Sequence, residues 1–136
     1  MGIILDTSVI VAVERAHESL NALITGREEE PFGISVVTAA ELLHGVERAD
    51  TEARKLRRQA FVEKVIESFP IFPFDLMIGR IYARIWAAVA RNGWTVGAHD
   101  LIIAATAISL DYSVATVNSR DFEKIPGVKV EKLQFL

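Results

Sequence analysis

Short apolar runs alternate with longer amphipathic segments along this chain, and the alternation predicts strands separated by helices. Five runs are predicted to be strands: 3–5, 32–37, 69–74, 113–117 and 128–133. The run 69–74 contains Pro70 and Pro73, which cannot donate to a ladder, so we expect it at an edge of the sheet. The last run alternates apolar and polar residues and is also expected at an edge.

Helical spacing of apolar residues fills the segments between these runs. The predicted helices are 7–16, 18–24, 38–48, 51–68, a long helix between Asp75 and the Asn92-Gly93 stop, and 100–110. Asp75 is expected to cap its helix. The segment 100–110 is apolar almost all round, which is typical of a helix buried in the domain centre. Strands that alternate with helices predict an α/β fold, with a parallel sheet covered by helices on both faces.

Length and composition agree with one globular domain spanning residues 1–136. The chain has 136 residues, of which 51% are hydrophobic and 24% charged. It contains no cysteine, which excludes disulfides and thiolate metal sites and leaves oxygen and imidazole as metal ligands.

The N-terminus lacks a basic segment before its apolar run, and Asp6 interrupts that run, so no signal peptide is predicted. No apolar stretch approaches the roughly 18 residues of a membrane span. We therefore expect a soluble cytoplasmic protein without a membrane partner.

Charge is unevenly distributed along the chain. The net charge of −3 argues against a globally basic nucleic-acid binder, yet residues 48–64 carry six Lys or Arg against three acids. This stretch is either a local basic surface or an ordinary solvated helix face.

Acidic and amide side chains follow the predicted strands, where an open α/β sheet binds its ligands. Asp6 directly follows the first strand, Glu41 lies in the first turn of the next predicted helix, and Asp100 starts the buried helix. Asn118 and Asp121 follow the run 113–117. We expect these side chains to meet at one rim of the sheet.

Each acid also has a structural interpretation. Asp6 and Asp100 are possible N-caps, Thr38 and Glu41 form a capping-box pattern, and residues 118–121 are typical of a turn. Together, however, caps at one rim would crowd several carboxylates, and two charges about 4 Å apart repel by roughly 4 kcal/mol at an effective dielectric of about 20. A cation such as Mg²⁺ or Mn²⁺ would relieve this repulsion and would support phosphodiester hydrolysis.

Four segments of the chain resemble the signature blocks of one known family. They read ILDTSVIVA, SVVTAAELLHGV, GAHDLIIAATA and ATVNSRDFEKIPGVKVE. In order and spacing they are similar to the blocks of PIN-domain ribonucleases, most closely the VapC-type toxins of prokaryotic toxin–antitoxin pairs. The resemblance covers essentially the whole chain.

This resemblance implies a three-layer α/β/α sandwich and a metal-dependent endoribonuclease that acts on structured RNA such as tRNA or rRNA. Asp6, Glu41 and Asp100 match the acids that hold the divalent metal and position the attacking water. It also implies a homodimer and a cognate VapB-type antitoxin, which often places a basic residue among the carboxylates.

The remaining site residues follow from the same resemblance. Asp121 is favoured as the fourth acid ligand over Asn118, which is expected to contact the site indirectly. Hydroxyls that assist the site are expected from Thr7, Ser8 and Thr116.

Candidate contacts to the RNA backbone are Arg54, Arg58, Arg80 and Arg84, whose alternative role is surface solvation. Two rival functions stay open at this point. One is a receiver-like phospho-acceptor domain, which also gathers acids around Mg²⁺; the other is an inactive interaction module with a PIN-like fold.

Overall fold

The structure, a computed structural model, describes residues 2–133. Five parallel strands form one sheet in the order β3-β2-β1-β4-β5. Their bounds are β1 Ile3–Leu5, β2 Phe32–Ser35, β3 Ile71–Phe72, β4 Ser113–Ala115 and β5 Val130–Glu131. The predicted parallel sheet is confirmed, and the run 69–74 supplies the edge strand β3.

Strand β1 lies at the centre of the sheet and pairs with both β2 and β4. Ile3 is in register with Phe32 on one side and with Ser113 on the other. From β1 the chain first builds one half of the sheet outward through β2 and β3, and later the other half through β4 and β5. Such a reversal of strand order leaves a crevice at the carboxyl ends of the central strands, where α/β proteins bind ligands.

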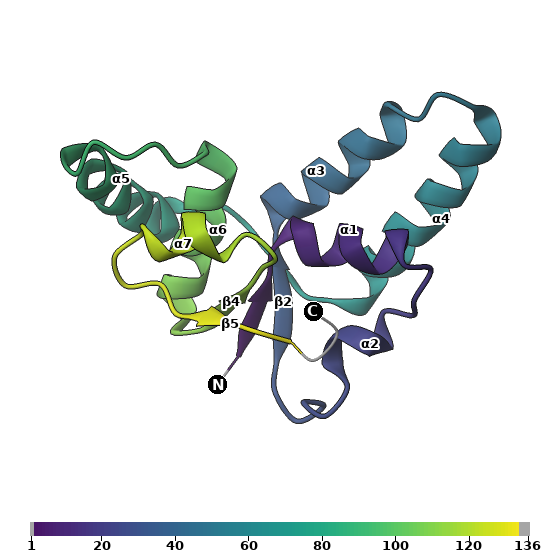
Figure 1. The fold of residues 1–136 in the computed structure, drawn as a ribbon, viewed down its shortest axis with the longest axis horizontal. Coiled ribbons are helices and arrows are strands. Elements are labelled where there is room, and N and C mark those ends of the chain that lie inside the picture. The colour runs from purple at the N-terminus through teal and green to yellow at the C-terminus, as the bar shows by residue number, and fades with distance from the viewer. Residues whose placement is uncertain (1, 134–136) are drawn as a thin grey trace.

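Helices cover both faces of the sheet, so the predicted three-layer α/β/α fold is confirmed (Figure 1). They are α1 Thr7–Arg15, α2 Asn21–Ile24, α3 Val36–Glu47, α4 Glu52–Ser68, α5 Leu76–Arg91, α6 Ala98–Leu110 and α7 Ser119–Glu123. Alternation along β1 divides the core, because Ile3 and Leu5 pack with α1, α3 and α4 whereas Ile4 packs with α5 and α6. Among residues 2–133 no helix is long and apolar enough to cross a bilayer.

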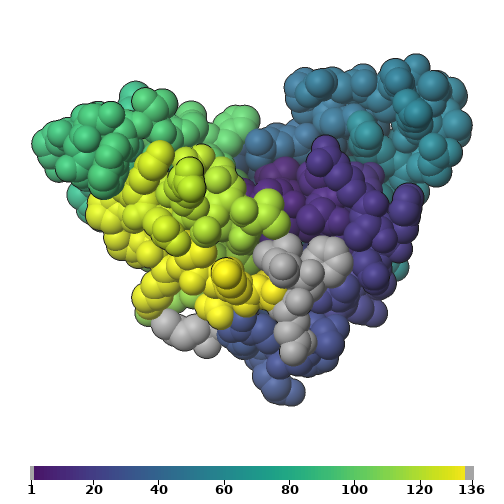
Figure 2. All heavy atoms as spheres, viewed as in Figure 1, coloured from purple at the N-terminus to yellow at the C-terminus, as the bar shows by residue number. Residues whose placement is uncertain are grey.

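The two helical layers diverge beyond the carboxyl ends of the central strands. The hairpin of α3 and α4 rises on one side and the pair α5 and α6 on the other, and Figure 2 shows the notch between them. Helix α1 starts at the base of this notch (Figure 1). The crevice expected from the strand order is therefore open to solvent.

The strand predicted over 32–37 is too long, and the helix predicted over 38–48 begins too late. The Ser35 hydroxyl accepts a hydrogen bond from the Val37 backbone amide at 3.1 Å, so Ser35 is the N-cap and α3 begins at Val36. Thr38 and Glu41 consequently lie inside the helix. The capping-box interpretation of these two residues is wrong, and Glu41 lies in the second helical turn rather than the first.

Other boundaries move by a few residues. Strand β4 ends at Ala115, α2 covers only Asn21–Ile24, and α7 replaces the turn considered at 118–121. Asp75 caps α5 as predicted, accepting from the Ile78 backbone amide at 2.9 Å.

Gly33 in β2 packs so closely against the edge strand β3 and the residue before it that a side chain at this position would not fit. A Cβ at this position would lie 2.5 Å from Phe72 Cε2 and 3.2 Å from the Pro70 carbonyl oxygen.

We expect Gly33→Ala to lower the free energy of unfolding by about 1 to 3 kcal/mol in urea titrations, the usual cost of overpacking. The control Gly79→Ala lies inside α5 with room for a Cβ, and should raise stability by about 0.5 to 1 kcal/mol. Equal effects of the two substitutions would contradict this packing.

Candidate active site

Asp6 directly follows β1 and is almost fully buried, with 4% of its surface exposed. Its Oδ2 accepts hydrogen bonds from the Ser8 hydroxyl at 2.6 Å and from the Thr116 hydroxyl at 2.8 Å. Although Asp6 precedes α1, its side chain makes no capping hydrogen bond. The carboxylate is thus held by two hydroxyls, from α1 and from the segment after β4, rather than used as a helix cap.

Glu41 projects from α3 toward the start of α1. Its Oε1 accepts a hydrogen bond from the Thr7 hydroxyl at 2.6 Å, and its Oε2 lies 3.2 Å from His99 Nδ1. Thr7 Oγ1 also lies 3.1 Å from the hydroxyl of Thr38, which is fully buried. Thr38 was not predicted as a site residue. The only sequence signal for Thr38 was its spacing from Glu41, which we interpreted as a cap.

Asp100 lies in the first turn of α6, but Gly97 is the N-cap of that helix. The cap interpretation of Asp100 is therefore wrong. Burial is the largest cause that raises the pKa of Asp100 to about 6, followed by the negative charges of Asp6, Glu41 and Asp121, while His99 acts to lower it. The three other acids predicted from the sequence thus lie near enough to act on Asp100.

Asp121, in α7, has a different environment from the other acids. Its carboxylate accepts a hydrogen bond from Asn118 Nδ2 at 2.9 Å and lies 3.5 Å from Lys124 Nζ. The hydrogen bond from Asn118, with help from Lys124, lowers the pKa of Asp121. Asn118 also donates its backbone amide to the Thr116 hydroxyl at 2.9 Å, which connects this corner of the cleft to Asp6.

The four arginines predicted to contact RNA do not lie together. Arg54 and Arg58 belong to α4, whereas Arg80 and Arg84 are on α5, in the opposite helical layer (Figure 1). Arg54 pairs with Asp50 at 2.9 Å. The basic residues of α4 are therefore a separate surface from those of α5.

The chemistry of the cleft fits a hard divalent cation. All predicted ligands are carboxylates, and the charges of the neighbouring acids add to burial in raising the pKa of Asp100. Within residues 2–133 no three acidic or histidine side chains lie close enough together to ligate one ion. Mg²⁺ tolerates such a site, because it keeps several waters and often takes only one or two carboxylates directly.

Comparison with known proteins identifies the fold and its chemistry. The family model described as the PIN domain matches residues 3–128. This chain belongs to the PIN domain family. It is 38% identical to Ribonuclease VapC1 of Rickettsia felis over 96% of this chain and 95% of that protein. It is also 37% identical to the tRNA(fMet)-specific endonuclease VapC of Salmonella typhimurium, over 72% of each chain.

A solved structure agrees with these relatives. The DNA-bound VapBC complex of Salmonella typhimurium matches this PIN domain with a TM-score of 0.85 and 29% identity, over 97% of this chain and 98% of that one. PIN-domain VapC ribonucleases are metal-dependent nucleases, so the predicted nuclease class is confirmed. The receiver-like domain and the inactive module are not favoured.

The raised pKa of Asp100 makes the stability of the metal-free PIN domain depend on pH. A carboxyl whose pKa is higher folded than unfolded stabilises the fold when protonated, and this contribution is lost as pH rises through about 6. We expect Asp100→Asn in EDTA to raise the free energy of unfolding at pH 7.5 by about 1 to 2 kcal/mol, discounted for partial exposure. It should also flatten the pH dependence of the free energy of unfolding between the ordinary carboxyl pKa of 3.8 and the raised pKa of about 6.

The matched control is Asp111→Asn, at the other end of α6. Asp111 is exposed, pairs with Lys129, and has a φ of 56° that asparagine adopts readily. Its pH profile should equal that of the wild type in thermal or urea unfolding. A less stable Asp100→Asn protein at pH 7.5 would show that burial and the neighbouring acids do not raise the pKa of Asp100.

Proposed function

We propose that this PIN domain is the toxin of a toxin–antitoxin pair, that it hydrolyses RNA phosphodiester bonds with Mg²⁺ or Mn²⁺, and that a VapB-type antitoxin inhibits it. The observation that carries the proposal is the convergence of the acids in one cleft: Ser8 and Thr7, neighbours in α1, bind Asp6 and Glu41, and His99, next to Asp100, lies 3.2 Å from Glu41. The neighbouring acids also help burial to raise the pKa of Asp100. Four carboxylates at the carboxyl ends of central parallel strands need a positive partner. A divalent metal is that partner when the enzyme works.

Asp6, Glu41 and Asp100 are the proposed metal-binding acids, one or two of which would contact the ion directly and the others through its waters. Neighbouring hydroxyls fix the orientation of two of them. Oδ2 of Asp6 accepts from Ser8 and Thr116, while Oδ1 accepts no side-chain hydrogen bond from residues 2–133 and stays free to ligate. Thr7 holds Oε1 of Glu41 in the same way. Hydrogen bonds of this kind fix the orientation of a ligating carboxylate.

A divalent cation, when bound, neutralises charge on the scissile phosphate and lowers the pKa of an attacking water. Asp100 lacks the hydroxyl partners of Asp6 among the described residues, so we assign it the positioning of that water. Asp121 is the fourth proposed ligand. Because its carboxylate already accepts a hydrogen bond from Asn118 and pairs with Lys124, we expect Asp121 to bind metal more weakly than the other three acids.

The proposed substrate is structured RNA. We favour tRNA over rRNA because one relative is named a tRNA(fMet)-specific endonuclease. Action on such RNA places the enzyme in the cytoplasm. The proposed antitoxin is of the VapB type, since a solved neighbour is a VapBC complex. A guanidinium from that partner would replace the charge of the metal among the carboxylates.

Removal of a proposed ligand should abolish cleavage without unfolding the protein. We expect Asp6→Asn and Asp100→Asn to lower the rate of tRNA cleavage at least about 100-fold, since loss of even outer partners of metal ligands costs roughly 10- to 100-fold. EDTA should stop the wild type, and Mg²⁺ or Mn²⁺ should restore it. The control Asp111→Asn should cleave normally. Full activity of either active-site variant, or of the wild type in excess EDTA, would refute the mechanism.

We further propose that the PIN domain forms a homodimer through α5. Large apolar side chains are exposed on this helix and just before it, and we call them the α5 surface. Tyr82 stacks on Trp86 with ring centroids 5.6 Å apart and meets Phe74 edge-on at 5.8 Å. Leu76 and Met77, in the first turn of α5, are 70% and 59% exposed. Exposed apolar side chains in such number mark protein interfaces, and a second copy would cover both α5 surfaces symmetrically.

A charge in this surface should separate the two copies. We expect Trp86→Glu to convert the dimer to a monomer in light scattering, because the symmetric interface would bury the new charge twice. The control is Leu56→Glu on α4, which changes a residue of similar exposure, 60%, outside the α5 surface. A monomeric wild type, or dissociation by the control alone, would overturn the proposed interface.

A further inference from the structure

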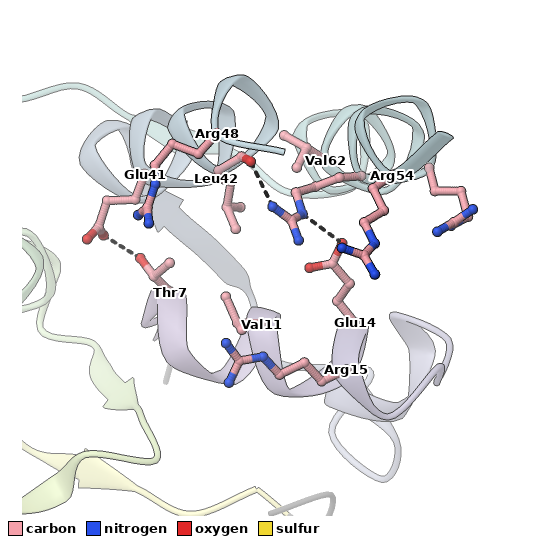
Figure 3. Close-up of a pocket in the computed structure, with 12 residues that line it drawn as sticks. Thr7, Val11, Glu14, Arg15, Glu41, Leu42, Arg48, Arg54 and Val62 are labelled. Atoms are coloured by element: carbon pink, nitrogen blue, oxygen red, sulfur yellow. Dashed lines mark hydrogen bonds and ion pairs between the residues drawn. The ribbon is translucent and has the colours of Figure 1, made fainter. Parts of the chain in front are cut away.

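A groove of about 570 Å³ lies between α1 and the hairpin of α3 and α4 (Figure 3). Thr7 and Glu41 line one end of it and also belong to the carboxylate cleft. Glu14 and Arg15 line the other end, along α1 (Figure 3). The groove is therefore a continuation of the proposed active site away from the acids.

Positive charge dominates the groove even though the whole chain is acidic. Its lining includes two glutamates, Glu14 and Glu41, and five arginines: Arg15, Arg48, Arg54, Arg57 and Arg58. The lining thus has an excess of three positive charges, in a chain whose net charge is −3. This concentration is large enough to attract a polyanion locally.

The arginines divide into those already engaged and those left free. Arg58 donates to the Gly45 carbonyl oxygen at 2.8 Å and lies 4.0 Å from Glu14, so it connects α4 to α3 and α1. Arg54 pairs with Asp50. Within residues 2–133, by contrast, no acidic side chain forms an ion pair with the three others: Arg15, Arg48 and Arg57.

We propose that this groove binds the RNA backbone next to the scissile phosphate. Arg15, Arg48 and Arg57 contact the phosphates, and Arg58 acts as a positioning residue that keeps the groove open. Figure 3 shows Arg48 on α3 and Arg15 on α1, on the two sides of the groove. The proposal rests on the proposed nuclease function and adds to it the path that the substrate takes out of the catalytic cleft.

RNA fits this arrangement better than an acidic peptide. A polyanionic backbone repeats its charge, so one phosphate can lie at the metal while its neighbours meet successive guanidinium groups, which bind phosphate bidentately. An acidic peptide would also be attracted by the arginines, but at Glu41 it would meet like charge. A ligand that fills both the arginine-lined groove and the carboxylate cleft must share a cation with Glu41 at the cleft, as a phosphate at the metal would.

The test compares two triple variants with the same loss of charge. The first is Arg15→Gln/Arg48→Gln/Arg57→Gln. The control is Lys64→Gln/Arg91→Gln/Lys132→Gln, whose three exposed cations line neither the groove nor the cleft. Binding of a fluorescein-labelled tRNA transcript is measured by anisotropy with Mg²⁺ at salt concentrations from about 50 to about 300 mM, on the order of the range in which phosphate contacts weaken strongly. Each triple carries Asp100→Asn so that the probe stays intact.

We expect the groove variant to bind tRNA at least about 30-fold more weakly and to reduce the slope of log Kd against log salt by about 2, because three phosphates are no longer neutralised and each contributes somewhat less than about 1. The control should change affinity less than about threefold. With an intact Asp100, the groove variant should raise KM for cleavage while kcat stays within about twofold, since its arginines lie away from the reacting phosphate.

Equal losses of affinity in both triple variants would mean general electrostatic attraction and would overturn the proposal. Unchanged tRNA binding by the groove variant, together with weakened binding of the antitoxin, would assign the groove to the antitoxin instead. Both results leave the nuclease function standing if Asp6→Asn still abolishes cleavage. Unimpaired cleavage by Asp6→Asn would refute that function separately.

Discussion

Repulsion between carboxylates in one cleft is the constraint on which this structure depends. Parallel strands bring the ends of β1 and β2 and the start of α6 to one rim, so Asp6, Glu41 and Asp100 meet whether or not their charges are balanced. The fold tolerates this because hydroxyls of Ser8, Thr116 and Thr7 stabilise two of the three acids. Asp100 has no such support among the described residues, and its pKa is raised. Asp100, the acid without hydroxyl partners in the described part of the chain, is thus the one whose ionised form a cation would stabilise most.

The sequence predicted the fold because its periodicity and topology follow simple rules. Strand β1, the Asp75 cap of α5 and the buried helix α6 were all visible in apolar spacing. The start of α3 was missed because Val36 and Val37 are β-branched and resemble a strand, whereas the Ser35 hydroxyl decides the boundary. A single side-chain hydrogen bond of this kind has no periodic signature.

The site was predictable only in part. Acids placed after strands could be expected to converge, but their individual partners depend on side-chain geometry between residues far apart in sequence. Thr38 and His99 illustrate this, since each reaches Glu41 or its partner through a contact that spacing does not reveal. The separation of Arg54 and Arg58 from Arg80 and Arg84 likewise depends on which layer α4 and α5 join.

The hydrogen bond between Thr116 and Asp6 joins residues 110 positions apart. During translation Asp6 leaves the ribosome 110 residues before Thr116, which is one of the two residues that hold its carboxylate. Strand β4, which also pairs with β1, arrives equally late. A nascent toxin therefore cannot assemble its cleft before β4 and Thr116 have been translated, and until then the ribosome that makes it is not exposed to a finished nuclease.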